Sequence, residues 1–280
     1  MKRTFLFISI LFLIGTSAFA AKSTMDDADA KLKSGDLKGA AVAYIDYYNN
    51  NKRDKSSARA LAMTGRIMDK LREVVSEEAE KKCYWGKNTP KTPQCMEKEV
   101  KEYNKIFGKD ALEYIGGTSI AYIDYTGSHY KELLKKFKNN KYSEEAEFYL
   151  MLQNLKGHPD EVLPKVKSFL GERKSGEWKK RSLLLWARVN QDVWNVWKEW
   201  SWVVFNKKIS DDEMIVRAEP YRQEALKTFS QIKGNSGFIG KAAKSEYKML
   251  NDQVDDGIHY SITNDSTPGT WANWGLSLTD

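Results

Sequence analysis

Residues 37–50 read LKGAAVAYIDYYNN, and residues 56–75 read SSARALAMTGRIMDKLREVV. In both segments apolar side chains recur at intervals of three and four, which places them on one face of a helix with 3.6 residues per turn. The two segments therefore predict an antiparallel helical pair. The predicted faces carry Leu37, Ala40, Ala41, Tyr44 and Tyr48 in the first helix, and Leu61, Gly65, Met68, Leu71 and Val75 in the second.

The same periodicity runs through most of the remaining chain. The stretch from 177 to 205 is long and apolar, with Trp186 and Trp197 on a single face, and it predicts a central buried helix. Residues 221–232 and 239–250 predict a further antiparallel pair across a turn that contains two glycines.

Glycine and proline interrupt the pattern in two places. A helix is expected to end at Gly157, and Pro159 is suited to begin the next one. After the break at Gly116 and Gly117, residues 119–125 alternate enough to pass for a strand. We favour a helix there, because the apolar stripe continues into the helical pattern that follows.

These patterns together predict an all-α fold of stacked antiparallel helical pairs over residues 21–254. Helical signals stop at residue 255, and residues 255–280 are rich in Gly, Ser, Thr, Asn and Asp. Such a composition is typical of an irregular or extended tail.

The first twenty residues have the pattern of a cleavable export signal. Lys2 and Arg3 precede an apolar run, and Ala18-Phe19-Ala20 is a small-x-small cleavage site. The apolar run is shorter than the roughly 20 residues that a helix needs to span a bilayer. We therefore expect cleavage after residue 20 and a periplasmic or secreted mature chain without a transmembrane segment.

The charge of the expected mature chain is mildly basic. Removing residues 1–20 takes away two positive charges and no negative ones, so the formal net charge falls from +7 to 7 − 2 = +5. Lysines and acids are interspersed, which is typical of a solvated surface. The sequence predicts no nucleic-acid partner, although a basic face is compatible with anionic cell-wall material or lipid headgroups.

Cys83 and Cys95 are the only cysteines, and the segment between them has the composition of a loop. In an oxidising compartment such a pair most simply forms one disulfide, worth about 3 kcal/mol. A zinc site needs about four ligands and no histidine is near in sequence, while a redox pair is normally a tight Cys-x-x-Cys. We predict a structural disulfide.

Small residues and aromatics recur in the helical pairs in a definite order. Ala28, Gly35, Asp36, Ala40 and Tyr44 resemble the corresponding positions of a tetratricopeptide repeat. The string FKNNKYSEEA at residues 137–146 resembles the repeat junction of envelope tetratricopeptide proteins, such as the outer-membrane assembly lipoprotein BamD and the Tol–Pal-associated periplasmic proteins. The resemblance implies a helical solenoid with an extended concave surface for another protein or peptide.

Motifs that carry chemistry are missing from the sequence. His129, His158 and His259 occur in unrelated contexts, without the spacing that puts two metal ligands on one helix face. There is no nucleophile elbow, phosphate loop or dinucleotide fingerprint. Acidic pairs such as Glu144-Glu145 precede apolar helical runs, where they favour the positive end of the helix dipole. The sequence thus predicts no catalytic residue, no metal site and no cofactor.

Tryptophan is concentrated between residues 178 and 202, where six occur. Aromatic side chains fill cores well and also anchor peptides or sugar rings. Trp194 and Trp202 lie off the main apolar face, so they are available to a ligand or to a second layer of packing. Trp271 and Trp274 lie in the expected tail, where they either pack back on the helices or dock a partner.

The leading hypothesis is a non-catalytic periplasmic helical-repeat scaffold that binds an envelope protein or peptide. Its surface is expected to be aromatic with a basic rim and to include inner-face residues such as Tyr44 and Tyr149. Two alternatives stay open. One is a module that recognises peptidoglycan or another glycan through exposed tryptophans, and the other is a cell-wall enzyme of the lytic-transglycosylase type.

Overall fold

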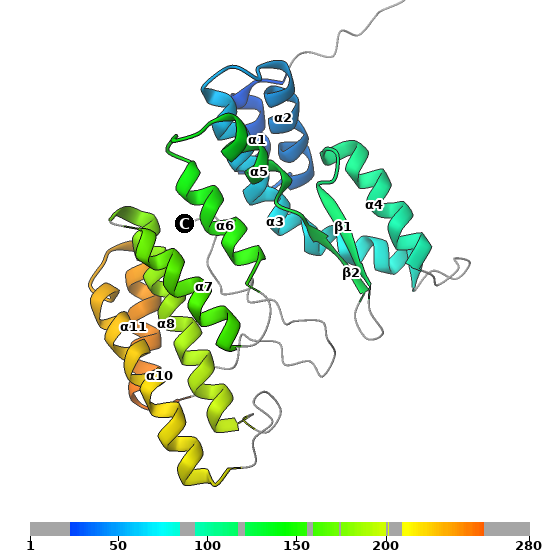
Figure 1. Ribbon diagram of the computed structural model, residues 1–280. Coiled ribbons are helices and arrows are strands. Elements are labelled where there is room, and N and C mark those ends of the chain that lie inside the picture. Colours follow the sequence, from blue (N-terminus) through cyan, green and yellow to red (C-terminus); the bar gives the residue numbers. More distant parts are fainter. Residues whose placement is uncertain are drawn as a thin grey trace, which may run out of the picture.

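The structure is a computed structural model that describes residues 23–84, 93–116, 121–155, 159–173, 175–199, 201 and 209–254. These residues are mostly helical, as the periodicity predicts (Figure 1). The expected signal at residues 1–20 and the expected tail at residues 255–280 lie outside the described residues. The N-terminal half contains α1 (Met25–Lys33), α2 (Leu37–Asn50), α3 (Ser56–Cys83), α4 (Pro93–Phe107), β1 (Leu112–Gly116), β2 (Ala121–Tyr125), α5 (Ser128–Lys136) and α6 (Ser143–Gln153). The C-terminal half contains α7 (Pro159–Glu172), α8 (Gly176–Glu199), α10 (Asp211–Ile232) and α11 (Gly237–Asn251).

Helices α2 and α3 pack against each other, which confirms the pair predicted from their apolar stripes. The carboxylate of Asp36 caps α2 by accepting the backbone N–H of Gly39 at 2.8 Å. On α3, Gly65 lies against the ring of Tyr130 from α5, and a Cβ there would approach that ring to 2.5 Å. The missing side chain is what lets α5 lie so close to α3.

Residues 121–125 form a strand, so the helix favoured for 119–125 is wrong. This strand, β2, pairs antiparallel with β1, and Tyr114 lies opposite Ile123 in the register. Tyr122, Ile123 and Tyr125 of β2 are aromatic or β-branched residues, which are enriched in strands. Gly127, with φ +75°, adopts a left-handed conformation at the start of α5 and separates the strand from the helix.

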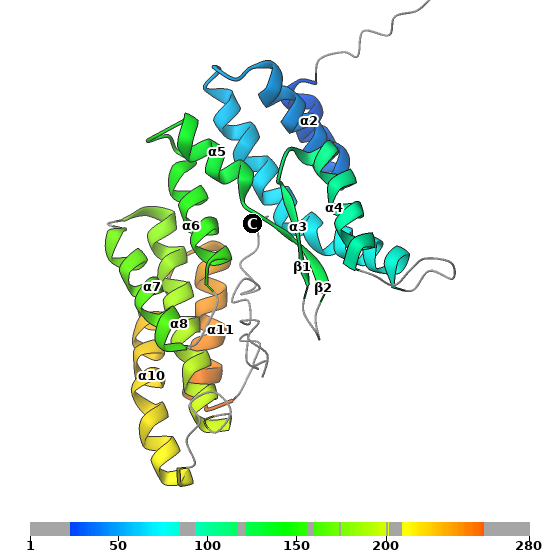
Figure 2. The same cartoon turned by 45° about the vertical axis from the view of Figure 1, so that its right-hand side comes forward.

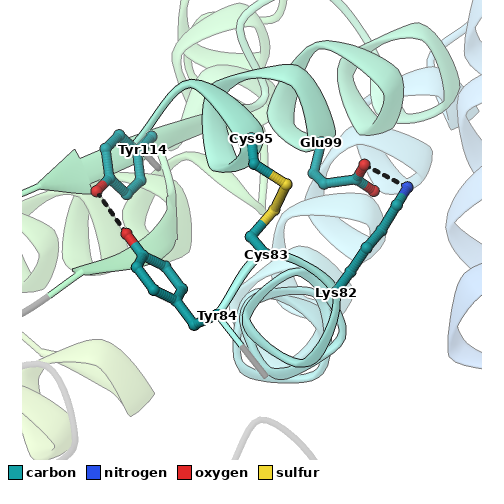
Figure 3. The surroundings of a disulfide bond; sticks show 6 residues. All are labelled: Lys82, Cys83, Tyr84, Cys95, Glu99 and Tyr114. Atoms are coloured by element: carbon teal, nitrogen blue, oxygen red, sulfur yellow. Dashed lines mark hydrogen bonds and ion pairs between the residues drawn. A yellow bond between two sulfur atoms is a disulfide. The ribbon is translucent and has the colours of Figure 1, made fainter. Parts of the chain in front are cut away.

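A disulfide between Cys83 and Cys95 joins the end of α3 to the start of α4, as the sequence predicts (Figure 3). Their Cα atoms are 5.6 Å apart, within the usual range for a bridge. Beside it, Lys82 pairs with Glu99 across the two helices. Helix α4 in turn covers β1 (Figure 1), so the bridge fixes the helix that supports the hairpin.

Helix α8 is the centre of the C-terminal half, which confirms the central buried helix over the part of residues 177–205 that the structure describes. It packs against α7, α10 and α11 (Figure 2). The pairing of α10 with α11 was also predicted, as was a helix start at Pro159. Trp178 of α8 lies 5.3 Å from Phe148 of α6, measured between ring centroids, and this contact joins the cores of the two halves.

Within the part of the chain that the structure describes, no helix is both long enough and apolar enough to cross a bilayer.

Candidate functional site

A cavity of about 400 Å³ opens between the second half of α3 and the strand β2. Three glutamates on α3 line it at intervals of four and three, which places them on one face of the helix. We call this cavity the acidic groove. Its lining residues are Arg72, Glu73, Ser76, Glu77 and Glu80 from α3, and Tyr122, Ile123 and Asp124 from β2.

The groove has a charged floor. Nη1 of Arg72 lies 2.9 Å from Oδ1 of Asp124, and both side chains are largely buried. The same guanidinium lies 3.9 Å from Asp69, one helical turn earlier on α3. Burial alone would lower the pKa of Arg72, but these two carboxylates raise it above its usual value. The pairs therefore keep a positive charge at the floor and tie β2 to α3.

A hydroxyl bridge reinforces the contact between strand and helix. The backbone N–H of Ile123 donates to Oγ of Ser76 at 3.0 Å, and that hydroxyl donates to Glu80 at 3.0 Å. The edge of β2 that faces away from β1 is therefore held by a side chain of α3. This bond also satisfies a buried backbone donor that a two-stranded sheet would otherwise leave unpaired.

The rim of the groove is negative. Glu73 and Glu77 are exposed and Glu80 is half-buried. Glu77 also pairs with Lys81 at 3.2 Å, where both side chains are about 70% exposed, and such a pair is weak. Among the described lining residues, four carboxylates stand against one guanidinium, that of Arg72. A cationic side chain entering the groove would meet this excess of negative charge.

Besides Arg72, two further groups at the groove have raised pKa values. Burial raises the pKa of Asp69, and the neighbouring charge of Asp124 adds to this effect, while Arg72 opposes it. Burial, followed by the charge of Asp124, raises the pKa of Tyr122. Both directions follow from placing ionisable groups near further negative charge in a partly dry site.

Asp124 also lines a second cavity of about 380 Å³. The described lining of this cavity includes Asp110, Glu113 and Lys131, whose Nζ donates to the backbone oxygen of Thr126 at 2.8 Å. Carboxylates therefore line both cavities next to β2, and Asp124 belongs to both.

The tyrosines expected on a binding face are in the core. Tyr44 is fully buried, and its hydroxyl donates to Asp29 of α1. Tyr149 is 5% exposed and stacks on Tyr130, with ring centroids 5.5 Å apart. Both lie between packed helices, because the apolar stripe that made them conspicuous is the stripe that helix packing covers. The structure therefore places neither on an open surface.

Of the tryptophans that the structure describes, Trp194 and Trp197 are buried, and Trp178 and Trp186 are half-buried against the core. Trp194 is 2% exposed, so it belongs to the second layer of packing that the sequence left open as an alternative. Lys198 covers its ring, with Nζ 4.5 Å from the centroid. Trp202, Trp271 and Trp274 lie outside the described residues. No described position brings an exposed tryptophan to the acidic groove.

The sequence reasoning missed the acidic groove. Its one available signal was the spacing of Glu73, Glu77 and Glu80, which puts three carboxylates on one face of a helix. The opposite wall depends on Asp124 and Tyr122 being in a strand, whereas the sequence pattern favours a helix for that segment.

A search against protein-family models, curated proteins and solved structures found no match for this chain.

Proposed function

We propose that this protein is a non-catalytic scaffold outside the cytoplasm that binds a basic segment of a partner protein or peptide in the acidic groove. The observation that carries the proposal is the composition of the groove, whose described lining residues comprise four carboxylates and one largely buried guanidinium. Lysine and arginine side chains of a partner provide the complementary charge.

The groove is built as a fixed surface, which supports recognition of a preformed partner segment. The pairing of Arg72 with Asp124 and the bond from Ile123 to Ser76 hold both walls together. The exposed rim glutamates stay available to solvent and to incoming cations. A volume of about 400 Å³ is in the range of ordinary ligand sites and is enough for one or two long side chains.

The wider setting of the proposal comes from the sequence. The pattern of an export signal at residues 1–20 supports a mature chain in the periplasm or outside the cell, and for such a chain we propose an envelope protein as the partner. The antiparallel helical pairs support a scaffold related to tetratricopeptide repeats, with the β-hairpin inserted between α4 and α5. Partner binding, unlike turnover, needs no nucleophile or metal at this site.

Peptide binding by fluorescence anisotropy tests the proposal. The probe is a labelled hexalysine peptide, with labelled hexaglutamate as the opposite charge. We expect saturable binding of hexalysine only. The variant Glu73→Gln/Glu77→Gln/Glu80→Gln should weaken it about tenfold or more, since each rim contact with a cation is worth a fraction of a kcal/mol to about 1 kcal/mol.

A matched variant controls for net charge. Glu97, Glu144 and Glu172 are exposed glutamates away from the groove, and replacing all three by glutamine removes the same total charge. We expect this variant to bind hexalysine within about twofold of the unmodified chain, since it leaves the groove carboxylates in place. An equal loss in both variants, or no loss in the groove variant, would overturn the proposed function.

A further inference from the structure

Seven cations gather at the end of the molecule where α3 begins. They come from the loop between α2 and α3 and from the segment that ends α5 and leads to α6. We call this set the basic end. It consists of Lys52, Arg53, Lys55, Lys135, Lys136, Lys138 and Lys141, all of them exposed.

The two segments lie side by side in space. The hydroxyl of Tyr48, at the end of α2, donates to Glu132 of α5 at 2.7 Å. Arg59, in the first turn of α3, interacts electrostatically with Tyr142 after the second segment. Figures 1 and 2, two views 45° apart, both show the α2–α3 and α5–α6 connections at the same end of the molecule.

The acids near the basic end do not cancel it. Within residues 51–55 and 135–141 the only acid is Asp54, which accepts the backbone N–H of Ser56 at 2.8 Å. The flanking Glu132 is engaged by Tyr48, and Glu144 lies in the first turn of α6, where the helix dipole stabilises it. Among the described residues, none of the seven cations forms an ion pair with a carboxylate.

We propose that the basic end docks the protein on an anionic lipid bilayer. Six of the seven cations are lysines, which act as mobile point charges suited to a diffuse array of headgroups, whereas arginine suits bidentate recognition of one phosphate. Neither cavity next to β2 is lined by any of the seven. The cations protrude from two adjacent connections, as contact with an extended surface requires.

The docking is electrostatic and does not involve insertion into the bilayer. Among the described residues, the large apolar side chains that are exposed are Val74, Ile106, Ile215, Val216 and Val254. None of them belongs to the basic end. Without an apolar anchor, attachment depends on headgroup charge and weakens as salt screens it.

The acidic groove stays accessible in this orientation. The groove begins near Arg72, about 16 residues along α3 from Ser56 in the first turn. Because a helix rises about 1.5 Å per residue, the groove lies roughly 25 Å from the basic end. A membrane-docked molecule therefore presents the groove away from the bilayer. This inference does not depend on what the groove binds.

Vesicle sedimentation tests the inference. The chain without residues 1–20 is mixed with vesicles of phosphatidylcholine and phosphatidylglycerol, or of phosphatidylcholine alone. We expect binding only to the anionic vesicles, and loss of binding as salt shortens the Debye length from about 10 Å at 0.1 M to about 3 Å at 1 M. The variant Lys52→Gln/Lys55→Gln/Lys138→Gln/Lys141→Gln should bind about tenfold or more weakly.

The control variant replaces Lys227, Lys241, Lys244 and Lys248 with glutamine. These lysines are exposed in α10 and α11, so the net charge changes equally while the basic end is kept. Circular dichroism shows whether both variants fold. Equal weakening by both variants, binding that resists 1 M salt, or binding to soluble polyphosphate without binding to vesicles would each overturn the inference.

Discussion

The two halves of the molecule differ in the contacts that hold their own elements together. In the N-terminal half, ion pairs join separate elements, as Arg66 does with Glu145 and Arg72 with Asp124. In the C-terminal half, most described ion pairs lie within one helix, such as Arg217 with Glu213. There α8 contacts its neighbours through apolar side chains and through the largely buried pair of Arg188 with Glu246 of α11. In the half that carries the acidic groove, ion pairs between separate elements add to the apolar contacts of the core.

The largest effect should come from breaking a pair that joins two elements. Asp124→Ala leaves the guanidinium of Arg72 buried without its carboxylate partner at 2.9 Å, while Asp69 stays 3.9 Å away. Removing one partner of a buried pair costs about 3 to 5 kcal/mol, so we expect a loss of that size in the free energy of unfolding, measured with urea.

The matched change in the other half is Glu213→Ala. Its pair with Arg217 lies within α10, and the two side chains are 39% and 44% exposed, so the loss should stay below about 0.5 kcal/mol. Similar losses for Asp124→Ala and Glu213→Ala would remove the contrast between the halves.

Breaking the disulfide should have the next largest effect. The double substitution Cys83→Ser/Cys95→Ser opens a loop of 12 residues and should lower the free energy of unfolding by about 3 kcal/mol. Reduction of the unmodified chain with dithiothreitol should give the same loss. If reduction leaves the denaturation midpoint unchanged, the bridge does not support the hairpin as we describe.

The N-terminal half should also be sensitive to acid through His129. Burial lowers the pKa of His129 to about 4, and its Nε2 lies 3.0 Å from the backbone oxygen of Phe107. The unfolded chain, with a pKa near 6.5, takes up the proton first as the pH falls. This group's contribution is therefore complete above pH 6.5 and lost between pH 6.5 and pH 4, a change of up to about 3 kcal/mol.

The measurement is the free energy of unfolding as a function of pH for the unmodified chain and for His129→Asn. The variant should be less stable at pH 7 but should lose less stability between pH 6.5 and pH 4. Parallel curves for the two proteins would show that His129 titrates normally in the folded state.

A smaller effect is expected from Gly65→Ala. The new methyl group would meet the ring of Tyr130 at 2.5 Å, and such overpacking costs about 1 to 3 kcal/mol. Thermal unfolding measures the loss, with Gly171→Ala as the control because a Cβ there meets no atom within 4 Å. An unchanged midpoint for Gly65→Ala would mean that α5 can shift away from α3 freely.

The helices were predictable because their periodicity is local. The stripes of α2 and α3, the helix after Pro159 and the pair α10–α11 could all be located from spacing alone. The hairpin was not, since residues 119–125 are ambiguous by themselves and become a strand by pairing with Leu112–Gly116. That pairing is a tertiary contact, and periodicity within one segment carries little information about it.

The candidate site could not be predicted for the same reason, because it too depends on a tertiary contact. Sequence reasoning selected Tyr44, Tyr149 and Trp194, whose aromatic character reflects burial in the core. The groove depends instead on Asp124 meeting Arg72, two residues far apart in the chain. From the sequence alone, glutamates that line a groove cannot be told from glutamates on an ordinary exposed helix face. The residues that form the opposite wall must be known first.

Site-specific photo-cross-linking in living cells tests the central claim most directly. A photoreactive amino acid replaces Glu77 at the groove rim, and in a parallel strain it replaces Glu172, which is also exposed but lies in another helix. The account predicts one defined product from position 77, with the cross-link mapped to a lysine- or arginine-rich segment of an envelope protein, and loss of that product when Glu73 and Glu80 become glutamine. No product at position 77, or the same product from position 172, would contradict the claim that the acidic groove binds a basic partner.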